Sequence, residues 1–257
     1  MPNHTTVLLK MHGPEDAIRN FVILANGSWP EAGEPGNLEF QNLYPMPQEL
    51  EGTTAPPAVV TQAEIDARRA RDDATHAPAS SLDNNNHIHD YGITQETYDR
   101  LISTYGYADW YSWRVANWGT KWGAYEVGEW HIDINGSGYL NAMVGFQTAW
   151  APPDAFLLNV SKNYPGVQFH MSHSDEGGSF LGWMEIVEGV VINQLELDWH
   201  SLEGMQLRKE LGVLDLEDMN KYDVEGRIHY LKEHPDDTSD ELELEELETL
   251  LKGMSND

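Results

Sequence analysis

The chain has no cysteine among its 257 residues, and this absence removes several classes of chemistry at once. Disulfide bonds, thiolate nucleophiles and zinc sites built on cysteine are all excluded. The chain also lacks any apolar run near the roughly 20 residues that cross a bilayer, so no membrane segment is expected. The start, MPNHTTVLLK, has neither the basic residues nor the long apolar stretch of a signal peptide. These features predict a soluble, cytoplasmic protein.

Basic residues are scarce, because 15 lysines and arginines face 43 aspartates and glutamates, for a formal net charge of −28. Such a surface repels phosphate backbones, so direct binding of nucleic acid is disfavoured. Three explanations of the acidity stay open: solubility alone, adaptation to a salt-rich cytoplasm, and an anionic face for a partner that itself binds nucleic acid. The common phosphate-loop, dinucleotide, serine-elbow and zinc-protease motifs are missing too. No catalytic residue, metal or cofactor is therefore predicted.

The apolar patterns that are present predict an α+β fold. Period-two alternation indicates strands, and helical spacing after Pro14, Thr94, Asp109 and Pro153 indicates helices. The expected strands are 6–11, 38–42, 130–134, 140–148, 167–174, 179–187 and 190–197. Hairpins combined with strand–helix–strand units favour a ferredoxin-like antiparallel sheet covered by helices on one face.

Composition divides the chain into three parts. Residues 1–47 and 91–199 form the predicted ferredoxin-like body, and the loop-like, turn-rich residues 48–90 are expected to be a mobile insertion. Residues 200–257 are predicted to form an acidic helical C-terminal extension. Its leucine stripe docks either on its own domain or on another chain. The partner-binding residues predicted there are Glu241, Leu244, Glu245, Leu247, Glu248 and Leu251.

The turn NWGTKWGAY, residues 117–125, places a lysine between two tryptophans. In one interpretation Trp118 and Trp122 are core anchors, with Lys121 lying across an indole. In the other, these residues and Trp150 line a ligand pocket between helix 98–118 and the sheet, with Lys121 as an anion contact. We expect the turn to be mainly architectural.

Histidines and acids supply two further candidates, which are HIHD at 87–90 and FHMSHSDE at 169–176. On a regular strand His170 and His173 project from opposite faces, which disfavours a shared metal site. His131 and Asp133 share a face and would meet His170 if their strands paired. The acids of Asp175-Glu176-Gly177-Gly178 suit either a hairpin loop or a cation or acid–base site.

Five segments resemble, in the same order, the YubB ferredoxin-like family of phage and plasmid proteins. They are Met1-Pro2-Asn3, YPMPQEL (44–50), NWGTKWGAY (117–125), FQTAWAPP (146–153) and SDEGGSFLGW (174–183). The resemblance spans most of residues 1–197, although Ala151 stands where serine is more usual and no tyrosine stands near Ser172-His173. It implies a ferredoxin-like fold and carriage on mobile elements, but no agreed activity, so Lys121, Asp175 and Glu176 inherit no role.

Three functions remain as hypotheses. The first is a non-enzymatic accessory protein of a phage or related element that binds a host protein with a basic face through its own acidic surface, in the infected cell. The second is a small-ligand or nucleotide binder. Its predicted ligand-binding residues are Trp118, Lys121, Trp122, Trp150, Asp175 and Glu176. The third is a metal-dependent hydrolase that uses the histidines with Asp175 or Glu176.

Overall fold

A six-stranded antiparallel sheet organises the chain, with the strand order β2-β3-β1-β4-β5-β6. The computed structural model describes residues 3–51, 53–75, 91–134, 136–199, 201–214, 221–233, 244–245, 247–249 and 251–252. The strands are β1 (His4–Pro14), β2 (His131–Ile134), β3 (Tyr139–Ala149), β4 (Gln168–Asp175), β5 (Leu181–Val187) and β6 (Val190–Glu196). Every pairing is antiparallel, and β1 lies between β3 and β4. The predicted α+β class is confirmed.

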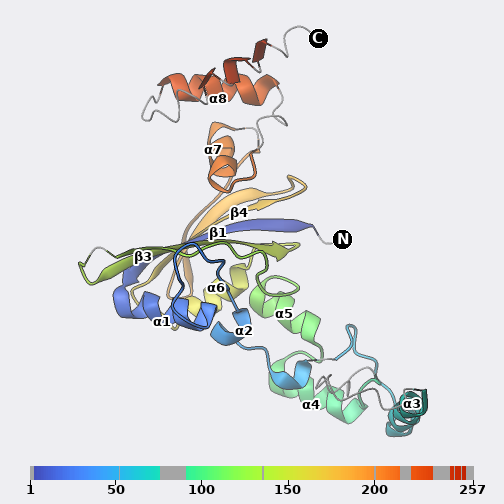
Figure 1. Ribbon diagram of the computed structural model, residues 1–257. Coiled ribbons are helices and arrows are strands. Elements are labelled where there is room, and N and C mark those ends of the chain that lie inside the picture. Colours follow the sequence, from blue (N-terminus) through green and yellow to red (C-terminus); the bar gives the residue numbers. More distant parts are fainter. Residues whose placement is uncertain are drawn as a thin grey trace.

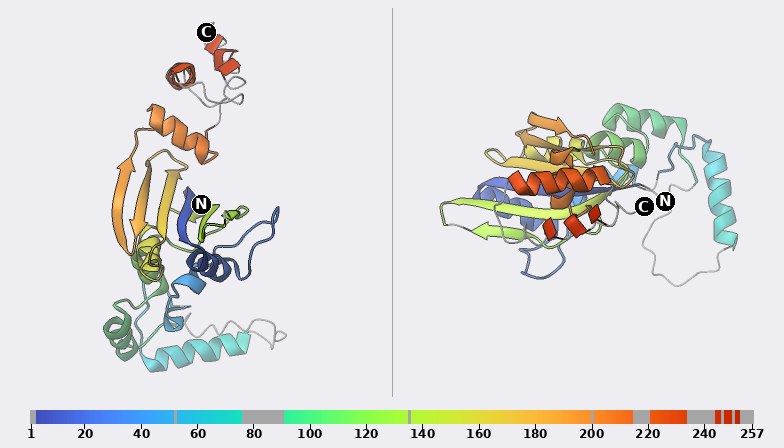
Figure 2. Two further views of the ribbon diagram at one scale, coloured as in Figure 1. Left: turned by 90° about the vertical axis from the view of Figure 1, so that its left-hand side faces the viewer. Right: turned by 90° about the horizontal axis from the view of Figure 1, so that it is seen from above.

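The helices lie mostly on one side of this sheet. They are α1 (Glu15–Asn26), α2 (Phe40–Leu43), the short 3-10 helix η1 (Gln48–Leu50), α3 (Gln62–Thr75), α4 (Gln95–Tyr105), α5 (Trp110–Trp118), α6 (Asp154–Ser161), α7 (Leu202–Glu210) and α8 (Lys221–Glu233). Figure 1 shows α1, α2 and α6 on one side, with α7 and α8 on the other. Figure 2 shows α3 and α8 at opposite ends of the molecule. Among the described residues, no helix combines the length and the apolar character needed to cross a membrane.

The main core fills the space between the sheet and the helices on its covered side. Val7 and Leu9 of β1 point into it and are fully buried. From the helices, Phe40 and Phe156 stack with ring centroids 3.7 Å apart and planes 9° from parallel. Since each buried aliphatic or aromatic side chain contributes about 1.5–3 kcal/mol, this layer is the principal source of stability.

The strand predicted at 38–42 is wrong, because α2 begins at Phe40. The Glu39 side chain caps this turn by accepting a hydrogen bond from the Gln41 N–H, and the Tyr44 N–H donates to the Phe40 carbonyl. Phe40 and Leu43 are the buried residues of the turn, at the i, i+3 spacing of a helix. Five alternating residues were too few to distinguish the two-residue period of a strand from the 3.6-residue period of a helix.

The predicted insertion contains ordered structure where it is described. Leu50 is fully buried in the main core, and α3 occupies 62–75. The HIHD motif at 87–90 lies outside the described residues. The division of the chain into body, insertion and extension stays a prediction.

A second, smaller core lies beyond the sheet. Its fully or nearly fully buried members are Met205, Val224, Ile228, Leu231 and Leu247. Leu244 and Leu251 pack against this cluster, so the leucine stripe of the C-terminal segment docks on its own chain. Glu241 lies outside the described residues, Glu245 is exposed, and Glu248 pairs with Lys232 at 2.8 Å.

Candidate functional site: the open face of the sheet

The face of the sheet opposite α1 and α6 carries a row of mostly polar side chains. Strand register places His131 of β2 beside Met143 of β3, and Met143 beside Lys10 of β1. Lys10 lies beside His170 of β4, which lies beside Glu185 of β5. Because side chains directly opposite in paired strands share a face, the five form one line across five strands. This surface is called the open face below.

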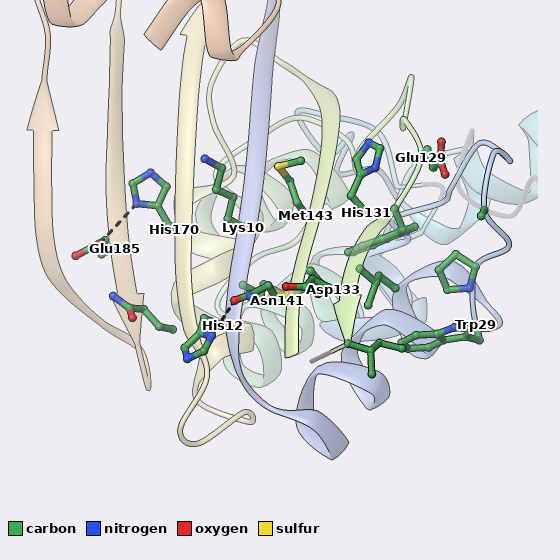
Figure 3. A pocket seen from close by; sticks show the side chains of 18 residues that line it. Lys10, His12, Trp29, Glu129, His131, Asp133, Asn141, Met143, His170 and Glu185 are labelled. Atoms are coloured by element: carbon green, nitrogen blue, oxygen red, sulfur yellow. Dashed lines mark hydrogen bonds and ion pairs between the residues drawn. The ribbon is translucent and has the colours of Figure 1, made fainter. Parts of the chain in front are cut away.

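A groove of about 920 Å³ follows this line on the open face. The next row of the sheet, which contains His12, Asn141 and Asp133, also lines it. Trp29 and Pro30, from the loop after α1, close the end beside β2. Figure 3 shows Lys10, Met143 and His170 rising from adjacent strands, with Trp29 at the far side.

Two of the imidazoles and the lysine of the groove already contact neighbouring side chains. The Nδ1 atom of His12 lies 2.8 Å from the Asn141 side-chain oxygen. Lys10 forms an ion pair with Glu210 at the end of α7. This pair is half-exposed, so it contributes at most about 1 kcal/mol and can open.

The second of these imidazoles, that of His170, lies between an acid and an aromatic ring. His170 Nδ1 lies 3.7 Å from Glu185, and its ring stacks on Trp183 at 5.3 Å. The His170 Nε2 atom lies 3.2 Å from the Ser172 hydroxyl, which is fully buried and is not among the residues that line the groove.

A metal centre built on these histidines finds no support. The strands of His131 and His170 do not pair, since β3 and β1 lie between them. Three strand spacings put the backbones roughly 14 Å apart. His173 points to the covered face and is 5 % exposed, so it is not near His170. Within the described part of the chain, no group of three or more histidines, aspartates or glutamates is placed to hold a metal ion.

The tryptophan turn divides between core and surface. Trp118 is 2 % exposed, and its indole N–H donates to the Tyr44 carbonyl at 2.9 Å. The Lys121 Nζ lies 4.7 Å from the centroid of the Trp122 ring, as one interpretation predicted. Trp150 is 54 % exposed. The predicted set of four therefore spans buried and exposed positions, and none of its members lines the groove.

Asp175 and Glu176 support the loop between β4 and β5. Asp175 is buried, and its two oxygens accept hydrogen bonds from the Asn3 side chain at 3.2 Å and the Ser179 N–H at 3.1 Å. Glu176 accepts from the His4 N–H at 3.1 Å. These contacts match the hairpin interpretation of the two acids.

Two ionisable groups on the covered side were not predicted to be perturbed. Burial raises the pKa of Asp154 to about 6, with a smaller contribution from Glu196. Burial lowers the pKa of His173 to about 4. The Asp154 Oδ1 and the His173 Nδ1 have no hydrogen-bond partner among the described residues. An acid in the first turn of a helix normally faces solvent, so the sequence carried no signal of its burial.

Sequence reasoning also missed Lys10, His12, Asn141 and Glu185. A partial signal existed, since Lys10 and His12 occupy alternate positions next to the apolar residues 7–9 and Met11 of the same strand. That alternation marks a face that is not buried. What it could not supply is the identity of the neighbouring strands.

Comparison with known proteins supports a ferredoxin-like domain. Residues 129–215 match a family described as the ferredoxin-like domain in Api92-like protein, so such a domain is present from β2 to α7. The crystal structure of protein api92 from Yersinia pseudotuberculosis is similar, with 10 % identity and a TM-score of 0.38, over 77 % of this chain and 98 % of that chain. No curated protein matches. The ferredoxin-like part of the resemblance is confirmed, and the YubB name stays a prediction.

Proposed function

We propose that this protein is a non-enzymatic binding protein whose open face takes an extended, basic segment of a partner protein. The observation that supports this most directly is the groove of about 920 Å³, which crosses the sheet opposite its main helical layer. From β2 to β5 the groove covers four strand spacings, or roughly 19 Å. That length matches roughly six residues of extended chain.

The charges of the groove favour a basic occupant. Glu129, Asp133 and Glu185 line it, against Lys10 as its one lysine or arginine. The ion pair with Glu210 already neutralises Lys10. The formal net charge of −28 extends this field over the whole protein and accelerates encounter with a basic partner.

The apolar residues of the groove would fix the register of the bound segment. Trp29 and Met143 offer an aromatic ring and a flexible thioether beside the acids. Aromatic rings and methionine are enriched at the centres of protein interfaces, where charged residues are depleted. A segment that alternates basic and apolar residues therefore suits the groove.

We further propose that the partner is a host protein, met in the cytoplasm of an infected cell. The resemblance to phage and plasmid proteins motivates this step. The acidic residues of the C-terminal segment would add to the attraction, with Glu245 as an exposed contributor. The leucines Leu244, Leu247 and Leu251 are engaged in the second core, which leaves the carboxylates as the contacts available there.

The test uses fluorescence anisotropy with a labelled peptide of alternating lysine and valine, at low salt. Asp133→Lys, in the groove, should weaken binding about tenfold, equivalent to about 1.4 kcal/mol. Glu96→Lys makes the same charge change on exposed α4, away from the groove, and should change the affinity less than twofold. Equal weakening by both variants would show diffuse attraction and contradict a groove site, as would the absence of binding.

A further inference from the structure

A second cavity, of about 390 Å³, lies at the other end of the open face. Thr6 of β1 is paired with Gln147 of β3 and with Ser174 of β4, and all three line the cavity. Trp199 and Val213, which flank α7 in the sequence, also line it. None of these residues belongs to the groove proposed for the partner segment.

Three polar side chains that line this cavity, those of Thr6, Gln147 and Ser174, make no hydrogen bond within the described residues. Ser174 is 2 % exposed, and its hydroxyl makes no hydrogen bond within the described residues. The Thr6 hydroxyl and the Gln147 side-chain amide are unpartnered in the same sense. Ser174 is buried, whereas Thr6 and Gln147 are half-buried, so a ligand in the cavity would replace solvent as the partner of these groups. The cavity wall therefore offers hydrogen-bonding groups that the fold does not use.

The charge around the cavity is negative. Glu126, Asp175 and Glu176 line it, and no lysine or arginine is among its lining residues. Asp175 accepts hydrogen bonds from Asn3 and Ser179, and Glu176 accepts one from the His4 N–H, whereas the Glu126 carboxylate has no hydrogen-bond partner among the described residues. Burial raises the pKa of the neighbouring Tyr125, and Glu126 and Glu176 raise it further.

The aromatic wall is compatible with a cation. The Arg208 guanidinium lies 4.8 Å from the centroid of the Trp199 ring, so this indole already accepts a cation next to the cavity. Arg208 itself is outside the lining. Gly178 has φ +70°, and a Cβ there would lie 3.6 Å from the Trp199 ring. The loop therefore lies against the indole at a distance that is ordinary for van der Waals contact.

We propose that this cavity binds a primary ammonium group on an aliphatic chain. An ammonium carries three N–H donors and no acceptor. The Glu126 carboxylate, the Ser174 hydroxyl and the Gln147 amide oxygen supply three acceptors from three segments of the chain, with charge on the first. A lysine side chain and a free polyamine share this chemistry. The inference does not depend on the role proposed for the groove, because the two sites share no residue.

The first experiment is an NMR chemical-shift titration of the full-length protein with butylammonium. We expect saturable shifts, and binding of tetramethylammonium, which has the same charge but no N–H, at least about tenfold weaker. Ser174→Ala and Glu126→Gln should each weaken butylammonium binding about tenfold. Glu96→Gln, on the exposed side of α4 and outside both cavities, is the matched control and should leave the affinity unchanged. Non-saturable shifts, equal affinity for tetramethylammonium, or unchanged binding by Glu126→Gln would overturn the proposal.

A second comparison identifies the source of the ammonium group. Spermidine that binds at least about tenfold more tightly than N-acetyl-lysine amide would support a free polyamine, and the reverse order would support a lysine of a protein. Whichever of the two ligands binds more tightly, Glu126→Gln must lower the affinity for it. Otherwise that ligand does not bind at this cavity. Loss of lysine–valine peptide binding in Asp133→Lys with butylammonium binding retained would separate the two sites functionally.

Discussion

The two faces of the same sheet are built from alternate residues of the same strands, and they differ in almost every property. On β1, Val7 and Leu9 are fully buried beneath the helices, whereas Thr6 and Lys10 line cavities on the open face. Because successive side chains of a strand point to opposite faces of the sheet, neighbouring residues lie in different environments. One face is organised by packing, and the other by pairs of polar groups.

This difference separates stability from recognition. Each fully buried aliphatic side chain on the covered face contributes about 1.5–3 kcal/mol, whereas the exposed ion pair between Lys10 and Glu210 contributes at most about 1 kcal/mol. Substitution of an exposed residue on the open face therefore changes the free energy of unfolding little. The sequence of that face can vary with the ligand that it binds. The covered face has no such freedom, because its side chains fill a close-packed layer.

The largest expected effect comes from removing an aromatic ring of the covered layer. Phe156→Ala should lower the free energy of unfolding by about 3–5 kcal/mol, because it deletes a fully buried ring and leaves a cavity. The ring also loses its stack with Phe40 at 3.7 Å. Denaturation in urea, followed by circular dichroism, measures the change.

The matched control lies on the open face. His131→Ala removes an exposed ring that lines the groove, and it should change the free energy of unfolding by less than about 0.5 kcal/mol. A loss as large as that of Phe156→Ala would mean that the open face also carries the fold. The contrast between the two faces would then be wrong.

The next effect is a pH dependence hidden on the covered side. His173 has a folded pKa of about 4 against 6.5 for the free side chain, so the unfolded state binds more protons between these values. Its contribution to stability is complete above pH 6.5 and falls by about 3 kcal/mol as the pH drops to about 4. Asp154 acts in the opposite sense, because its folded pKa of about 6 exceeds 3.8. The buried Asp154 carboxyl therefore lowers the free energy of unfolding by about 3 kcal/mol as the pH rises from 3.8 to about 6.

Two variants uncover these opposing effects. Relative to wild type, Asp154→Asn should gain up to about 3 kcal/mol as the pH rises from 3.8 to about 6. His173→Leu should lose a similar amount relative to wild type as the pH rises from about 4 to 6.5. Urea denaturation across this pH range measures both differences. Differences that do not vary with pH would contradict the burial of the two charges.

The covered face could be predicted from the sequence, because buried positions show as a regular pattern of apolar residues within each strand. Residues 140–148 alternate apolar and other residues, and β3 forms there with Leu140, Ala142, Val144 and Phe146 buried. The start of a helix was equally local: a helix was predicted after Asp109, and the Asp109 side chain accepts a hydrogen bond from the Ser112 N–H at the start of α5. The strand predicted at 38–42 failed because a single turn of helix is shorter than the pattern that would reveal it.

The open face could not be predicted to the same extent, because it depends on strand order. Residues His131, Lys10 and His170 come from distant parts of the sequence, and they align only because β1 inserts between β3 and β4. The hypothesis that His131 meets His170 assumed that their strands pair, which they do not. Periodicity assigned each residue to a face but carried no information on which strands are neighbours.

The smallest expected effect concerns the turn between α5 and the sheet, where core and surface meet. Lys121→Ala removes an ammonium that lies 4.7 Å from the Trp122 centroid, and it should lower the free energy of unfolding by about 0.5–1 kcal/mol. Lys121→Arg, which keeps the charge over the ring, should restore most of this loss. Urea denaturation of the pair distinguishes the cation–ring contact from packing of the aliphatic stem. If Lys121→Met were as stable as wild type, the stem would account for the stability and the charge would contribute nothing.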